Sequence, residues 1–119
     1  MTEDEFRKKI IFICSVDAKR MLLCKGKYNL YYRCPRYDRR NRPPGQKACT
    51  NRMSIRERNL LLDRLWRAYE NGTFVPGLRG EEGDVVYEVS ELNDFYITVR
   101  IVNARTVRQE VIGRDRDDV

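Results

Sequence analysis

The feature that most constrains the fold of this chain is the placement of its cysteines. The 119 residues hold four, all within the first 49 and spaced C-x9-C-x9-C-x14-C, and no histidine. Four thiolates complete the tetrahedral shell of a structural zinc ion, and such ions hold small segments that cannot build a full core. At this length one domain is expected. A shared zinc is therefore the favoured interpretation, beside unligated thiols and disulfides, which stay open.

One segment resembles the second half of a zinc ribbon. Residues 30–37 read Leu-Tyr-Tyr-Arg-Cys-Pro-Arg-Tyr, and residues 48–52 read Ala-Cys-Thr-Asn-Arg. In zinc ribbons an aromatic strand runs into a Cys-Pro knuckle, and zinc joins two such knuckles. The resemblance covers about residues 14–52, and Tyr37 stands where the second knuckle cysteine is expected. It implies a structural zinc held by four cysteines, Cys14, Cys24, Cys34 and Cys49.

The alternatives to zinc depend on the surroundings of each cysteine and on the compartment. Cys14 and Cys24 follow apolar residues, and free cysteines are among the most often buried residues. The acidic start, residues 1–5, is unlike a secretory signal, and the longest apolar run has only five residues. We therefore expect a cytoplasmic protein without a membrane partner, in which disulfides are the least favoured state of the cysteines.

Positive charge is concentrated in the front part of the chain. The net charge is +6 overall, +10 over residues 1–70 and −4 over residues 71–119. Arginine predominates between residues 33 and 58, and its planar guanidinium matches phosphate geometry and stacks on bases. Tyrosines nearby add faces on which bases stack. The residues expected to bind nucleic acid are Arg33, Arg36, Arg39, Arg40, Arg42, Lys47, Arg52 and Tyr37. A solvated face or a protein-binding surface are the other interpretations of this segment.

Several kinds of enzyme are not supported by the sequence. Without histidine the chain holds no Ser-His-Asp or Cys-His triad and no His-ligated catalytic zinc. Residues 77–80 lack the Gly-Lys-Ser/Thr ending of a phosphate-binding loop. We therefore expect a non-enzymatic nucleic-acid-binding or regulatory module, with an Arg-rich loop ordered by zinc. The alternative is a small inhibitor or adaptor, of the kind that phages and mobile elements encode, acting on a host protein or nucleoprotein complex.

Hydrophobic periodicity predicts a small α+β fold. Ser54-x-x-Glu57 begins a helix over about 54–71, and Asn71-Gly72 ends it. Residues 21–33 are typical of a hairpin whose turn contains Gly26, and residues 85–89 and 95–102 alternate as a second hairpin. The start of the chain is ambiguous: a helix from residue 3 is plausible, and residues 10–13 also fit a strand. A loop is expected at 77–83, and an edge strand is a candidate at 105–112.

The domain organisation follows from these elements. We expect a Cys-rich basic part over residues 1–53, a helix with an antiparallel hairpin or meander over 54–112, and a tail over 113–119. Apolar stripes on the helix and on the second hairpin provide partners for one core, so the parts are expected to form one compact unit.

Overall fold

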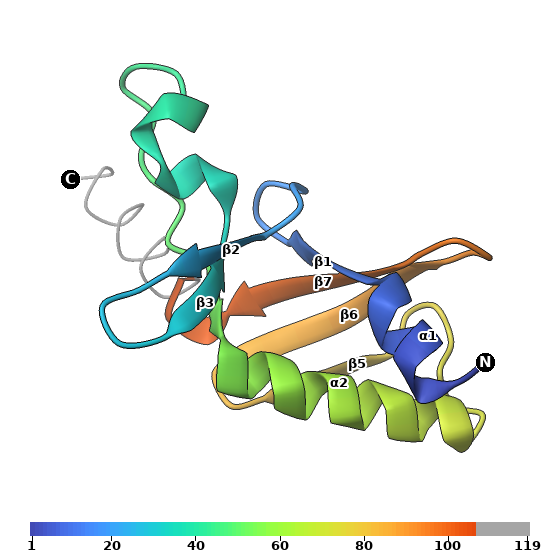
Figure 1. Ribbon diagram of the computed structural model, residues 1–119. Helices are drawn as coiled ribbons and strands as arrows, with labels where there is room; N and C mark the ends of the chain where they lie inside the picture. Colours follow the sequence, from blue (N-terminus) through green and yellow to red (C-terminus); the bar gives the residue numbers. More distant parts are fainter. Residues whose placement is uncertain (107–119) are drawn as a thin grey trace.

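The computed structural model describes residues 1–106 and confirms the α+β class (Figure 1). The elements, in chain order, are α1 (Glu3–Lys9), β1 (Ile10–Cys14), β2 (Leu22–Lys25), β3 (Leu30–Arg33), the 3-10 turns η1 (Pro35–Tyr37) and η2 (Arg39–Asn41), β4 (Arg52–Ser54), α2 (Ile55–Glu70), β5 (Arg79–Glu82), β6 (Val85–Leu92) and β7 (Ile97–Asn103). Residues 10–14, ambiguous in the sequence, form a strand directly after the first helix. None of the helices in residues 1–106 is long and apolar enough to span a membrane.

The strands form two sheets. The larger sheet has the order β1-β7-β6-β5, in which β1 runs parallel to β7 and the other neighbours are antiparallel. The smaller sheet, β2-β3-β4, is antiparallel throughout. Because β1 comes from the start of the chain and β7 from its second half, the large sheet is built from both halves.

Helix α2 begins where the sequence predicts. The Ser54 hydroxyl accepts from Glu57 N, and the Glu57 carboxylate accepts from Ser54 N, which together make a capping box. The helix ends before Asn71, and Gly72 follows with φ at +74°, a left-handed conformation that glycine adopts without strain. The helix prediction for residues 54–71 is therefore confirmed.

The core lies between the helices and one face of the large sheet. Alternate residues of β6 and β7 point into it, as the two-residue period of a strand requires. The buried set contributed by the helices and these two strands is Phe6, Leu61, Leu62, Leu65, Val85, Tyr87, Val89, Ile97, Val99 and Ile101. Phe6 of α1 contacts the rings of Trp66, Tyr69 and Phe74, so an aromatic cluster joins the two helices.

Three local expectations need correction. Phe95, predicted to share the buried face of its strand, lies in the β6–β7 turn and is 84% exposed. Residues 79–82, predicted as part of a loop, pair with β6 as β5. A glycine in a hairpin turn is expected to be free to take a positive φ, but Gly26 does not take one. A Cβ there would lie 2.8 Å from Asn29 O, so the close backbone approach explains the glycine. Most of the candidate edge strand 105–112 lies outside the described residues, as does the tail.

Candidate metal centre and adjoining groove

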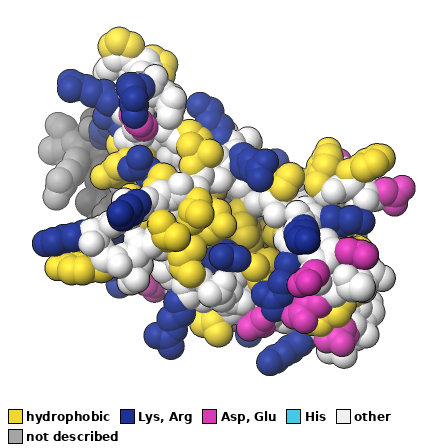
Figure 2. Space-filling view, in the orientation of Figure 1, with side chains coloured by type: hydrophobic (Ala, Val, Ile, Leu, Met, Phe, Trp, Pro, Cys, Tyr) yellow, Lys and Arg dark blue, Asp and Glu magenta, His cyan; other side chains and the backbone are white. Residues whose placement is uncertain are grey.

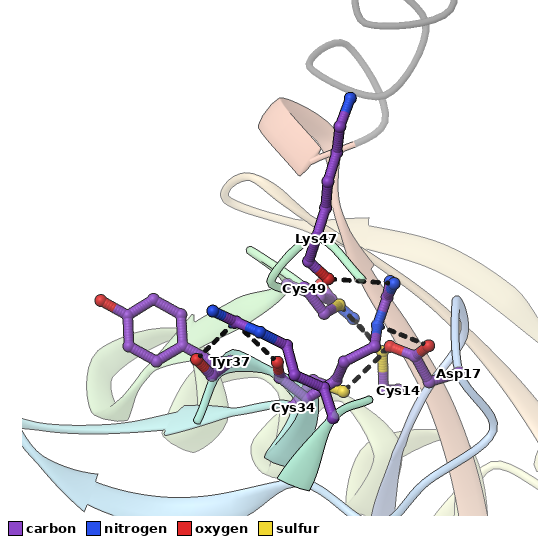
Figure 3. A network of polar contacts seen from close by, with 9 residues as sticks. Cys14, Asp17, Cys34, Tyr37, Lys47 and Cys49 are labelled. Atoms are coloured by element: carbon purple, nitrogen blue, oxygen red, sulfur yellow. Dashed lines mark hydrogen bonds and ion pairs between the residues drawn. The ribbon is translucent and has the colours of Figure 1, made fainter. Parts of the chain in front are cut away.

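Three cysteines and one aspartate converge where the two sheets meet. Cys14, Asp17, Cys34 and Cys49 each offer one ligand atom, and these atoms lie within 4.8 Å of one another (Figure 3). The three thiols are fully or almost fully buried. A group of this composition could hold a metal ion, and its donors come from segments far apart in the chain.

Local structure positions each of the four donors. Cys14 ends β1, and a turn after it returns the chain, with Ala18 N donating to Cys14 O and Ala18 in a left-handed conformation at φ 55°. Asp17 lies in this turn, three residues after Cys14. Cys34 follows β3 and caps η1, where Pro35 occupies the first helical position. Cys49 precedes β4 by three residues.

The distances suit a tetrahedral ion. Cys14 Sγ and Cys49 Sγ are 3.9 Å apart, and two thiolates bound to one zinc lie roughly 3.8 Å apart when each Zn–S bond is about 2.3 Å. Asp17 Oδ2 lies 3.0 Å from Cys34 Sγ and 3.8 Å from Cys14 Sγ. All four cysteines are free thiols, so no disulfide competes with this arrangement.

Cys24 lies apart from this cluster. It is on β2 of the small sheet, half-buried, with its Sγ 3.6 Å from Leu22 O. The four-cysteine set implied by the zinc-ribbon resemblance therefore differs from the structure at one position, which Asp17 fills. The resemblance failed here because β2 pairs with β3, and that pairing carries Cys24 to a different part of the small sheet.

Contacts among the three thiols and the carboxylate shift the pKa values of all four groups. The hydrogen bond from Cys49 lowers the pKa of Cys14 to about 6, and the same contact, with burial, raises the pKa of Cys49. Burial and a hydrogen bond to Asp17 raise the pKa of Cys34 to about 12. For Asp17, burial opposes ionisation, but the contacts with Cys34 and the other neighbours hold its pKa below the usual value. These directions favour ionised Cys14 and Asp17 beside protonated Cys34 and Cys49, so binding a metal through all three sulfurs would release the protons of Cys34 and Cys49.

An arginine supports the carboxylate from behind. Arg36 Nε lies 2.9 Å from Asp17 Oδ1, although the N–H does not point along a hydrogen bond, and an Nη atom donates to Lys47 O at 3.3 Å. Arg36 thus fixes the orientation of Asp17 and holds the loop against the cluster. Outer partners of this kind commonly orient metal ligands.

Asn51 connects the cluster to both sheets and is fully buried. Its amide group donates to Cys14 Sγ at 3.1 Å and to Ile101 O at 2.9 Å. Its carbonyl oxygen accepts from Asn103 N at 2.7 Å. The Asn51 side chain therefore forms hydrogen bonds to β1 and to β7, and the residue itself directly precedes β4.

A basic, aromatic groove is lined in part by Asn51. It consists of two cavities of about 290 and 490 Å³ that share Tyr31, Arg52, Asn103 and Arg105. The smaller cavity is also lined by Arg33 and Tyr37, and the Arg33 guanidinium lies 4.5 Å from the centre of the Tyr37 ring. The larger one also holds Lys27, and its two acidic groups are already engaged: Glu57 in the helix cap and Asp84 with Arg105.

The groove contains three of the eight residues predicted to bind nucleic acid, namely Arg33, Tyr37 and Arg52. The other five lie in the loop between Cys34 and Cys49. Arg36 faces Asp17, Arg40 pairs with Asp38, and Arg42 donates to the carbonyls of Arg36 and Tyr37. Arg39 and Lys47 are exposed. The guanidinium groups of Arg36 and Arg42 thus hold the loop through these contacts, and they are not free to bind a phosphate as the prediction assumed.

Several residues of the site were missed in the sequence. Asp17 has a signal, because its spacing from Cys14 equals that of the paired ligands in a knuckle, with a carboxylate in place of the second thiol. Tyr31 is one of the tyrosines near the Arg-rich segment, although only Tyr37 was among the residues expected to bind nucleic acid. Asn51 and Arg105 have no signal that we can identify. Their roles depend on the parallel pairing of β1 with β7 and on the approach of the small sheet, which no local pattern encodes.

Comparison with known proteins adds no assignment. No protein-family model matches this chain, no curated protein matches it, and no solved structure matches it.

Proposed function

We propose that this chain is a nucleic-acid-binding module, with its contact surface in the groove between Tyr37 and Lys27 and with a structural zinc at Cys14, Asp17, Cys34 and Cys49. The observation that carries the proposal is the juxtaposition of the two sites. A groove lined by arginines and tyrosines lies beside a buried cluster of three thiols and a carboxylate, and Asn51 lines the one while contacting the other.

Zinc is the metal that the donor set favours. Thiolates are soft ligands that select zinc over magnesium or calcium, and three thiolates with one carboxylate fill four tetrahedral positions. No position is left for a reacting water, because Asp17 supplies the fourth donor. The role proposed for the ion is therefore structural: it would hold the ends of β1 and β3 and the start of β4 together.

The groove matches single-stranded nucleic acid better than a duplex. Tyr31 and Tyr37 offer ring faces for unstacked bases, while Lys27, Arg33 and Arg52 offer cations for phosphates. Arg105 would join them by exchanging Asp84 for a phosphate. With about three or four phosphate contacts, the log-log dependence of affinity on salt would have a slope of roughly −2 to −3. The arrangement supports contact through backbone and stacking, without a preference for a base sequence.

The test measures binding of a fluorescent single-stranded oligonucleotide to the full chain, by fluorescence anisotropy, at several salt concentrations. The double variant Arg33→Glu/Arg52→Glu is expected to weaken binding by at least about 100-fold, because two cations become repulsive. The matched control is Arg67→Glu/Arg100→Glu, which changes the net charge equally at exposed positions outside the groove. Equal loss in both double variants, or no loss in either, would show that the groove is not the contact surface.

A further inference from the structure

A second, apolar groove lies between the small sheet and α2. Several apolar side chains of the β2–β3 hairpin are exposed there, although they share a strand face with a buried core residue. Leu23, Leu30 and Tyr32 share one face of the β2–β3 hairpin, since Leu23 pairs with Tyr32 and Leu30 is two residues before it. On the next strand, Tyr32 pairs with Met53 of β4, which is buried, so this face leads into the core. Leu23 and Leu30 remain 51% and 47% exposed, and Leu60 of α2 is 42% exposed.

Two separate hollows, which share no lining residue, adjoin this face, and we refer to them together as the apolar groove. The first, of about 590 Å³, is lined by Asn29, Leu30, Ser54, Ile55, Arg56, Asn59 and Leu60. The second, of about 430 Å³, is lined by Arg7, Ile10, Ile11, Phe12, Arg20, Met21, Leu22, Leu23, Tyr32, Arg58 and Leu62. Figure 2 shows the same face, with hydrophobic side chains gathered over the small sheet and Lys and Arg around them. Such apolar surface with a polar rim marks an interaction site.

The charge of this groove is entirely positive. Neither hollow has an acidic lining residue. Arg7 is paired with Glu3 and Asp63, whereas the structure gives no ion pair within residues 1–106 for the arginines at 20, 56 and 58. Arg58 is the most informative of them: its Nε is buried without a hydrogen-bond partner in the described chain, and its guanidinium lies 5.9 Å from the centre of the Tyr32 ring.

We propose that this groove binds a partner protein through a segment that carries large apolar side chains flanked by Asp or Glu. The apolar side chains would enter the hollow between Leu30, Ile55 and Leu60. The acidic groups would pair with the three basic lining residues Arg20, Arg56 and Arg58. The inference is independent of the proposed nucleic-acid groove, because the two use opposite faces of β2–β3: Arg33 and Tyr31 alternate with Leu30 and Tyr32.

An apolar floor favours a protein segment over nucleic acid. Phosphates gain little beside leucine side chains, whereas leucine-like side chains of a partner bury apolar area there at about 25 cal/mol per Å². Arginines at the rim add attraction for carboxylates and discriminate against basic segments. The combination selects a class of partner rather than a single sequence.

The experiment is a selection of short random peptides displayed on phage against the immobilised full chain, followed by affinity measurement with one synthetic enriched peptide. We expect enriched peptides with at least two large apolar residues and a net negative charge. Leu30→Asp/Leu60→Asp should weaken the synthetic peptide by at least about 10-fold, because both side chains are lost from the groove. Val75→Asp, also at an exposed apolar position but outside both hollows, should not.

Arg58→Gln separates charge from shape. It should weaken the acidic peptide several-fold and make its affinity less dependent on salt, while leaving a version of the peptide with Gln for each Glu unchanged. Enrichment of basic or uncharged peptides, or full binding by Leu30→Asp/Leu60→Asp, would overturn the proposal. Competition of an oligonucleotide with the peptide would also overturn it, because the groove would then bind nucleic acid. A wild-type dimer that Leu60→Asp dissociates would overturn it as well, because the groove would then bind a second copy of the chain.

Discussion

At the scale of single residues, the candidate metal centre depends on groups that are not ligands. Asn51 is the clearest case, because its amide contacts Cys14 Sγ and Ile101 O while its carbonyl accepts from Asn103 N. Ile101 O also accepts from Ser15 N, whereas Asn103 N, in the buried residue Asn103, donates to the Asn51 carbonyl. Removal of the Asn51 side chain would therefore leave at least one buried donor unsatisfied.

We expect Asn51→Ala to lower the free energy of unfolding by about 2 kcal/mol, the usual cost of a buried polar group without a partner. Chemical denaturation of the full chain with added zinc measures this directly. Asn59→Ala, at an exposed position of α2, is the control and should change stability by less than about 0.5 kcal/mol. If the two variants lose the same stability, Asn51 does not have the structural role assigned to it.

At the scale of elements, local sequence determined some parts of the fold and not others. Helix α2 was predictable because its cap, its apolar stripe and its terminator lie within one short segment. The second hairpin was predictable for the same reason, apart from Phe95, which continues the alternation but lies two residues before Ile97, the first paired residue of β7. In contrast, β5 contains two glutamates and a glycine, and its pairing with β6 is what makes it a strand.

The capping box of α2 also joins distant elements. Glu57 Oε1 accepts from Ser54 N, and Glu57 Oε2 accepts from Asp84 N at the β5–β6 turn. We expect Ser54→Ala to destabilise the protein by about 1 kcal/mol, because one helix N–H loses its partner. Thermal unfolding should show the change, while Ser15→Ala, which removes an exposed hydroxyl outside any helix, should show none. A Ser54 variant as stable as the wild type would contradict the role of this cap.

The candidate site was less predictable than the fold for a physical reason. Two of its ligands, Cys34 and Cys49, stand in polar stretches where burial in a core explains little, and that marked them in the sequence. Whether Cys24 or Asp17 joins them depends on strand register, because the pairing of β2 with β3 sets where Cys24 points. Register arises from contacts across the whole sheet, so one sequence does not reveal it.

At the scale of the whole molecule, the cluster lies at the junction of the two sheets. Cys14 ends a strand of the large sheet, and Cys34 directly follows a strand of the small one. A metal ion there would set how the small sheet stands against the rest of the protein. Both faces of that sheet would then depend on the ion: the basic face with Arg33 and Tyr31, and the apolar face with Leu30 and Tyr32.

The measurement that tests this account most directly is native mass spectrometry of the untagged, nuclease-treated protein and of two cysteine variants. We predict one zinc per chain in the wild type and in Cys24→Ser, and none in Cys34→Ser. Chelation should remove the ion and shift the wild type to the high charge states of an unfolded chain. A wild type that stays folded without metal, or a Cys24→Ser variant that loses its zinc, would contradict the account.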